Sequence, residues 1–245
     1  NIIVGNAAHI KNVPGRKTDV LDAEWLSTLV MHGLISPSFV PNRTIRNLRD
    51  AARTYKKFVG EYVRYKNRVD KFLQTHGFKL SGTMKDIFCV SGRNIMNALA
   101  LRGSLTIDDI NSCVRGSLKS SVQKIYDAMS VSISDYEQQL LSLLLKRLSR
   151  SEEEIEEIVD LMENIALPYK RTLEIMRSIP GIDKASSLLI LAEIGSDIVH
   201  DFGSAPKLCC WAGLCPRKDE SAQKDKSKKI MPGNQYLKPI LNQVA

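Results

Sequence analysis

Residues 45–73 read IRNLRDAARTYKKFVGEYVRYKNRVDKFL, and this stretch decides how most of the chain is organised. Apolar residues recur along it in alternating steps of three and four, and Lys66 is the one polar residue at a stripe position. The stripe consists of Ile45, Leu48, Ala52, Tyr55, Val59, Tyr62, Val69 and Leu73. Such spacing predicts a long helix that pairs with another helix along one face. Gly60 within this helix costs about 1 kcal/mol relative to alanine, and Gly77 ends it.

A partner helix is predicted further along the chain. A second helical pattern begins near Ser117, and its apolar residues between Val122 and Leu148 can share one face. Ser151, followed three residues later by Glu154, has the capping-box pattern and predicts that a new helix begins there. The two long helical segments together predict an antiparallel coiled coil with a small helical insert at its tip.

Shorter elements are expected on both sides of this coiled coil. Residues 1–17 predict a short strand and a loop, and a helix follows from Thr18 to about His32. Beyond Tyr169 short helices alternate with turns, and the last helix opens at Asn234. We therefore expect a mainly α fold in three parts: residues 1–41, a coiled-coil arm over 42–168, and a helical C-terminal part over 169–245.

The charge of the chain is unevenly distributed. The sequence has 35 Lys and Arg against 27 Asp and Glu, a net charge of +8 and a pI near 9.2. Between residues 43 and 71, ten basic residues stand against three acidic ones, so this stretch alone carries +7. A solvated coiled-coil flank usually mixes both signs, whereas a stripe of one sign attracts a phosphate backbone. The cations expected to bind nucleic acid here are Arg43, Arg46, Arg49, Arg53, Lys56, Lys57 and Arg64.

Cysteine usage and hydropathy bear on the cellular compartment. Five cysteines, an odd number without zinc-site spacing, predict a reducing, cytoplasmic environment. No apolar run reaches the roughly 18 residues that a membrane span needs. Because the chain opens on Asn1 rather than Met, we expect that an N-terminal piece precedes it, and that the last helix is truncated at the C-terminus.

Three small motifs can carry chemistry. Asp19 and Asp22 stand three apart in a first helical turn, where paired carboxylates can bind Mg²⁺ or simply suit the helix dipole. The turn around Gly181, in Ile179-Pro180-Gly181-Ile182, fits either a phosphate-binding helix-hairpin-helix or an ordinary helix corner. Ser221 is an ordinary loop serine unless a base or a metal activates it. The cations that follow it, which we also expect to bind nucleic acid, are Lys224, Lys226, Lys228 and Lys229.

Longer stretches resemble a known family. The run NVPGRKTDVLDAEWL (residues 12–26) resembles the end of the RuvC-like domain in DEDD insertion-sequence transposases, also known as bridge-RNA-guided recombinases. GLISPSFVP (33–41), RSIPGI (177–182) and LAEIG (191–195) continue the likeness. WAGLCPRKDESA (211–222) and PGNQYLK (232–238) are similar to the C-terminal serine transposase domain of that family. The resemblance covers nearly the whole chain.

The resemblance implies a function and roles for three residues. Asp19 and Asp22 match the last two acids of the family's four-carboxylate set, and Ser221 matches the nucleophile that joins covalently to a DNA phosphate. Mg²⁺ is the implied cofactor, and donor DNA, target DNA and a guide RNA are the implied partners, in a bacterial or archaeal cytoplasm. Residues 1–41 would be the remainder of an RNase H/RuvC-like α/β domain, and the coiled coil would build a homodimer or homotetramer.

One departure from the family pattern keeps alternatives open. The family's first Asp and its Glu match nothing in this sequence, since residues 1–18 contain no acid. We expect those acids to precede Asn1, which would leave this fragment inactive alone. The alternatives are a RuvC-like metal-dependent nuclease, which uses water and leaves Ser221 inert, and a non-catalytic nucleic-acid-binding helical protein.

Overall fold

The computed structural model describes residues 4–5, 19–35, 40–215, 220–221, 224–225, 230 and 233–244. The fold is mainly α, as the sequence predicts. The chain divides into two compact units. We call residues 50–164 the central unit and residues 1–49 with 165–245 the terminal unit. Within the described ranges, no helix is both long and apolar enough to cross a membrane.

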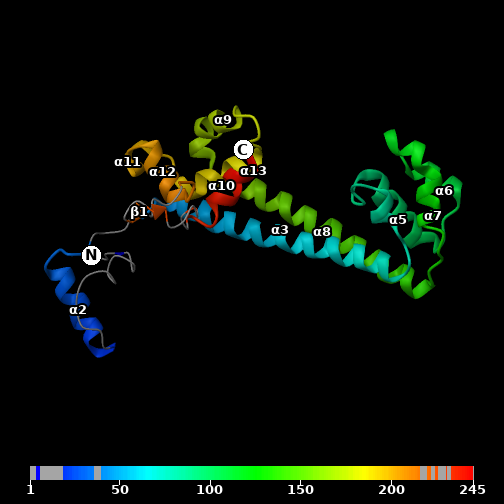
Figure 1. Ribbon diagram of the computed structural model, residues 1–245, viewed down its shortest axis with the longest axis horizontal. Helices are drawn as coiled ribbons and strands as arrows, with labels where there is room; N and C mark the ends of the chain where they lie inside the picture. Colours follow the sequence, from blue (N-terminus) through cyan, green and yellow to red (C-terminus); the bar gives the residue numbers. More distant parts are fainter. Residues whose placement is uncertain are drawn as a thin grey trace. The chain divides into compact units, whose positions relative to one another are not determined.

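Two long helices form the body of the central unit. They are α3 (Arg43–Thr75), which belongs to this unit from Asp50 onward, and α8 (Asp135–Ile165). The Tyr62 hydroxyl donates to Glu152 Oε1 over 2.8 Å. Arg147 Nε donates to the Tyr65 hydroxyl over 3.0 Å. Because residue numbers rise along α3 as they fall along α8, the helices run antiparallel, side by side in Figure 1. Regular coiled-coil packing between them stays a prediction.

The apolar stripe of α3 is buried most deeply near its ends. Ala52, Val69 and Leu73 are buried, whereas Val59 in the middle is half-buried. Lys66, the polar residue at a stripe position, places its ammonium 4.6 Å from the Phe88 ring centroid. A cation over an aromatic face is stabilised there, so the stripe continues through Lys66 without burying an unpaired charge.

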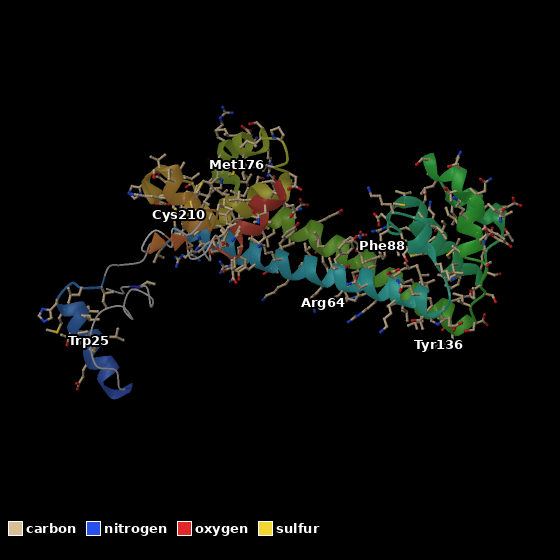
Figure 2. The ribbon with its side chains drawn as sticks, in the orientation of Figure 1. Trp25, Arg64, Phe88, Tyr136, Met176 and Cys210 are labelled. Atoms are coloured by element: carbon tan, nitrogen blue, oxygen red, sulfur yellow. The ribbon has the colours of Figure 1, made fainter. Side chains whose placement is uncertain are left out.

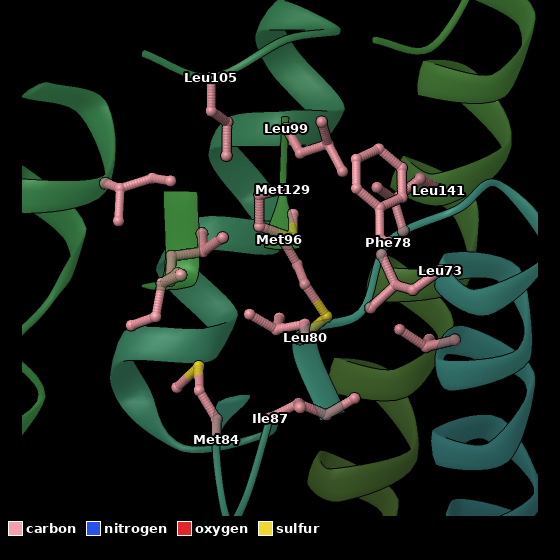
Figure 3. Packing of buried hydrophobic residues seen from close by; sticks show 14 of the residues in the cluster. Leu73, Phe78, Leu80, Met84, Ile87, Met96, Leu99, Leu105, Met129 and Leu141 are labelled. Atoms are coloured by element: carbon pink, nitrogen blue, oxygen red, sulfur yellow. The ribbon is translucent and has the colours of Figure 1, made fainter. Parts of the chain in front are cut away.

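Short helices form the tip of the central unit. They are α4 (Leu80–Thr83), α5 (Val90–Arg102), α6 (Ile107–Cys113), the 3₁₀ helix η1 (Gly116–Ser121) and α7 (Val122–Ala128). Their apolar residues surround one core together with Leu73 of α3 and Leu141 of α8, and Figure 3 shows Phe78, Met96 and Leu99 within it. This core makes the predicted helical insert a folded part of the central unit.

Two predictions about the second long helix are wrong. The helix does not begin near Ser117, because η1 and α7 precede it and α8 begins only at Asp135. Ser134 and Glu137 start α8 as a capping box, in which Glu137 Oε2 accepts from the Ser134 amide at 2.7 Å. No new helix begins at Ser151 either: it is buried within α8, and its hydroxyl donates to the carbonyl of residue 148 at 2.7 Å.

The terminal unit consists of short elements. They are α2 (Asp19–Met31), the 3₁₀ helix η2 (Leu167–Tyr169), α9 (Lys170–Arg177), α10 (Lys184–Ile194), α11 (Ile198–Phe202), α12 (Ala205–Ala212), β1 (Glu220–Ser221), β2 (Lys224–Asp225) and α13 (Leu237–Val244). Helix α10 is buried from Ser187 to Ile194 and packs against α9 and α13. Most of residues 1–18 lie outside the described part, so the expected RuvC-like remainder stays a prediction.

Candidate functional site

Ser221 lies on a short β-hairpin. Strand β1 pairs antiparallel with β2, and Ser221 is in register with Lys224. Lys226, Lys228 and Lys229 lie outside the described residues. The pairing therefore brings the candidate nucleophile and the first of the predicted cations opposite each other on adjacent strands.

The two ends of the segment that carries this hairpin are held together at its base. Residues 213–234, which we call the Ser221 loop, leave from the end of α12 and return beside it. The amide of Asn234 donates to the carbonyl of Trp211 at 3.3 Å. Gly233 is packed so tightly that an added Cβ would lie 2.3 Å from the backbone of Ala212. The base of the loop thus has a fixed position next to α12.

A buried carboxylate contacts the base of the Ser221 loop. Glu193, in α10, is only 5% exposed. Its Oε2 accepts a hydrogen bond from Asn234 Nδ2 at 2.8 Å. Asn234 Oδ1 in turn accepts from the amides of Tyr236 and Leu237, at 2.8 and 2.9 Å, and caps the start of α13. We call these contacts the Glu193–Asn234 clasp, because the Asn234 side chain ties α10 to the start of α13 while its backbone amide is bonded to α12.

The sequence contains one signal for the clasp. Glu193 interrupts an otherwise apolar helical run from Leu188 to Ile194, and an acid in such a run needs a hydrogen-bond partner when it is buried. The partner, Asn234, follows 41 residues later and could not be identified from spacing. The sequence assigns a functional role to neither residue.

Arg49, one of the predicted nucleic-acid-binding residues, holds the end of α10. Its Nε donates to the carbonyl of Ala192 at 3.0 Å, and its NH2 donates to the carbonyl of Glu193 at 3.1 Å. These carbonyls lie in the last turn of the helix, where a positive charge is favourable. Arg49 therefore has a structural role, which its position among the basic residues between 43 and 71 does not indicate.

The other predicted cations of α3 differ in exposure. Arg43, Arg46, Lys57 and Arg64 are exposed. Arg53 and Lys56 are half-buried and make contacts with other residues. Arg64 projects from α3 in Figure 2. The exposed members are the ones whose charges reach solvent, and so they are the stronger candidates for contact with a phosphate backbone.

The turn around Gly181 joins α9 to α10. Gly181 has φ +89°, and a Cβ there would lie 2.7 Å from the carbonyl oxygen of Val244. The Asp183 carboxylate accepts a hydrogen bond from the amide of Ser186, and this hydrogen bond lowers the pKa of Asp183. The glycine is thus required by its backbone conformation and by packing against α13. Phosphate binding at this turn stays a prediction.

Asp19 and Asp22, the predicted metal ligands, lie one turn apart at the start of α2. Their side chains are outside what the structure describes. Across the described ranges, His, Cys, Asp and Glu side chains nowhere gather in threes around a point that could hold a metal ion. A Mg²⁺ site built on these two aspartates therefore stays a prediction.

Two family models match separate parts of the chain. A model of DEDD transposases of the IS110 type, described as "Transposase", matches residues 1–77. A model described as "Transposase IS116/IS110/IS902 family" matches residues 173–245. The second match includes the Ser221 loop and both residues of the clasp. A search of curated proteins gave no match.

Proposed function

The chain belongs to the DEDD insertion-sequence transposases, enzymes that cut and rejoin DNA, and from this premise we propose that Ser221 is its covalent nucleophile. The observation that supports this role most directly is the position of Ser221. It lies on a hairpin, in register with Lys224, within a loop whose base is held by Gly233 and Asn234. A nucleophile needs such a fixed support, because small displacements at the reacting atom cost large factors in rate.

The proposed reaction breaks and re-forms phosphodiester bonds without net hydrolysis. Ser221 Oγ attacks a DNA phosphorus and loses its proton, an Oγ–P bond forms, and a P–O bond to one sugar breaks. The departing sugar oxygen takes up a proton. In the second step a sugar hydroxyl of another strand attacks the same phosphorus, and the Ser221 hydroxyl is regenerated. Each step exchanges one phosphate ester for another, so strand joining needs no nucleotide triphosphate.

Cations near Ser221 would stabilise the charge that develops on the phosphate. Lys224 stands opposite Ser221 in the hairpin, and Lys226, Lys228 and Lys229 follow in sequence. Positive groups arranged in advance around a transferring phosphoryl group lower the barrier without reorganising during the reaction. We assign this role to Lys224 first.

Asp19 and Asp22 would hold Mg²⁺ in the assembled site. Two carboxylates one helical turn apart fit a cation that takes one or two protein carboxylates together with phosphate oxygens. When bound, the metal would neutralise phosphate charge and ease the loss of the serine proton. This chain supplies two of the four acids that the family pattern requires. A homodimer or homotetramer would let the Ser221 loop of one protomer serve the carboxylates of another.

The exposed cations of α3 would bind the phosphate backbone of nucleic acid. Arg43, Arg46, Lys57 and Arg64 present charge to solvent without reading bases. Target choice would then rest on base pairing with a guide RNA, the partner that the resemblance implies.

The test is a search for a protein–DNA adduct that survives denaturant. The full-length protein is incubated with Mg²⁺, its guide RNA and DNA carrying the ends of its own insertion sequence. Wild type and Ser227→Ala should both form the adduct, whereas Ser221→Ala should form none and still bind DNA. An adduct that persists in Ser221→Ala contradicts the proposal. Strand cutting without any adduct would favour a metal-dependent nuclease that uses water.

A further inference from the structure

Two thiols meet at the base of the Ser221 loop, and no step of the proposed reaction uses them. The Sγ atoms of Cys210, at the end of α12, and Cys215, two residues beyond Gly213, lie 3.1 Å apart. Cys210 is exposed and Cys215 is half-buried, and both are free cysteines. Figure 2 labels Cys210 on the ribbon.

The backbone explains why these two side chains come together. Helix α12 ends in a Schellman motif, in which the amide of Leu214 donates to the carbonyl of Cys209 at 3.0 Å. The amide of Gly213 donates to the carbonyl of Cys210 at 3.1 Å, and Gly213 has φ +76°. This reversal returns the chain over the last turn of α12, so the thiol pair follows from the helix end and not from one rotamer alone.

We propose that Cys210 and Cys215 form a redox-modification site, a dithiol that a small-molecule disulfide such as glutathione disulfide converts to an intramolecular disulfide. The Cys210 thiolate attacks one sulfur of glutathione disulfide, forms a mixed disulfide and releases one glutathione. Cys215 then attacks the Cys210 sulfur, forms the protein disulfide and releases the second glutathione. Two protein thiols are oxidised and one disulfide is reduced to two glutathione thiols, so electrons and protons balance.

The order of attack follows from exposure and acidity. Cys210 is the more exposed of the two thiols and meets the oxidant first. The hydrogen bond with Cys210 raises the pKa of the Cys215 thiol, so less of it is present as the attacking thiolate. Cys215 is therefore the resolving cysteine, which acts within the contact that already exists.

Oxidation would also act on Ser221, a consequence that rests on the proposed function. A disulfide requires the sulfurs to approach to about 2.05 Å, which draws Cys215 toward α12. Cys215 lies six residues before Ser221 in the loop. Because a misplacement of about 1 Å can lower a rate by about 100-fold, the oxidised protein should form less Ser221–DNA adduct.

The first arm of the test reads the thiol chemistry alone. Full-length reduced protein is treated with glutathione disulfide, free thiols are alkylated, and the protein is digested with trypsin. Residues 208–217 form one tryptic peptide that contains Cys209, Cys210 and Cys215. The site predicts this peptide two hydrogens lighter, with a single alkyl group on Cys209. Cys209→Ser should still form the disulfide, and Cys215→Ser should stop at a glutathione adduct on Cys210. A peptide with three alkyl groups, or a Cys209–Cys210 bond, would overturn the proposal.

The second arm measures the Ser221–DNA adduct in reduced and oxidised protein. Oxidation should lower adduct formation in wild type and Cys209→Ser but not in Cys215→Ser. Equal adduct from oxidised and reduced wild type, with the disulfide present, would overturn the link to Ser221. Absence of any adduct in the reduced protein would instead count against the proposed function, while the disulfide result of the first arm stands by itself.

Discussion

The central unit places the Arg93–Glu152 ion pair at half-buried positions, whereas the terminal unit buries a carboxylate among its helices. In the central unit, Arg93 and Glu152 pair while 29% and 32% of their side-chain surfaces stay exposed. In the terminal unit, Glu193 is 5% exposed and bonded to Asn234. A partly exposed ion pair contributes modestly to stability, while a buried carboxylate is costly unless its hydrogen bonds are made.

This difference indicates what each unit is built to do. The central unit buries a continuous apolar core formed by residues of α3, α5, α7 and α8. The terminal unit accepts a buried acid in order to fix one position, the return of the Ser221 loop beside α12. If Ser221 is the nucleophile, the contacts of Gly233, Glu193 and Asn234 fix the base of its loop, and the central unit contributes the exposed cations Lys57 and Arg64.

The largest expected effect is at Gly233. Gly233→Val would place a side chain within 2.3 Å of the Ala212 backbone, so the loop base must open. We expect a loss of about 3 kcal/mol in the free energy of unfolding, from overpacking against backbone. Gly60→Ala in α3 is the matched control, since nothing lies within 4 Å of it, and helix propensity should stabilise it by about 1 kcal/mol. Urea unfolding followed by tryptophan fluorescence and circular dichroism measures both, and an unchanged midpoint for Gly233→Val would refute the close approach.

The next effect compares the clasp with the polar network of the central unit. Asn234→Ala removes one hydrogen bond to Glu193 and the cap of α13, and should cost about 2 kcal/mol. Tyr62→Phe should cost about 1 kcal/mol or less, because Arg93 continues to donate to Glu152. Glu193→Gln keeps an acceptor oxygen and should lose less than Asn234→Ala. Similar losses for Asn234→Ala and Tyr62→Phe would remove the contrast between the units.

A third prediction concerns the charge of the central unit. Replacing Lys57 and Arg64 of α3 with alanine should weaken nucleic-acid binding and flatten its salt dependence by up to about 0.9 per lost phosphate contact. Lys119→Ala with Lys124→Ala removes two exposed cations from the tip, in η1 and α7, and should leave the salt slope unchanged. Binding titrations across salt concentrations measure the slopes. Equal slopes for both double variants would mean that the position of the charge on α3 does not matter.

The smallest predicted effect is on acid stability. The hydrogen bond from Arg93 lowers the pKa of Glu152. The stability from this pair is therefore fully present above the ordinary carboxyl pKa of about 4.3, and it is lost as the pH falls through the lower folded pKa. Glu152→Gln should flatten the acid limb of the stability curve, whereas Glu153→Gln, which removes the same charge from an exposed position, should not. Superimposable acid limbs for wild type and Glu152→Gln would show that the pair has no effect.

The sequence predicted what depends on repeated spacing. The apolar stripe from Ile45 to Leu73 predicts α3, because apolar residues that recur every three or four positions over such a length fit a helix and not a strand. The beginning of α8 was misplaced because Val122, Ile125 and Met129 continue the same period while belonging to α7 and its end. The boundary between α7 and α8 is marked by the capping box of Ser134 and Glu137. The same sequence pattern occurs at Ser151 and Glu154, where no helix begins.

Contacts between distant motifs could not be predicted in the same way. Glu193 and Asn234 each lie in a stretch that resembles the family, but neither stretch indicates the other as its partner. In the sequence, Arg49 cannot be distinguished from the other basic residues between 43 and 71. Only the fold shows that it bonds to the end of α10. Ser221 was identified by resemblance alone, because a loop serine has no pattern of its own.

The residue that carries the DNA in the adduct can be identified directly. The denatured adduct is digested with nuclease and trypsin and then analysed by mass spectrometry. Residues 219–224 form a tryptic peptide, DESAQK, in which Ser221 is the single hydroxyl-bearing residue. We expect a nucleotide on this peptide, linked to Ser221 by a phosphodiester bond. A nucleotide on Ser227 or on any other peptide would contradict it.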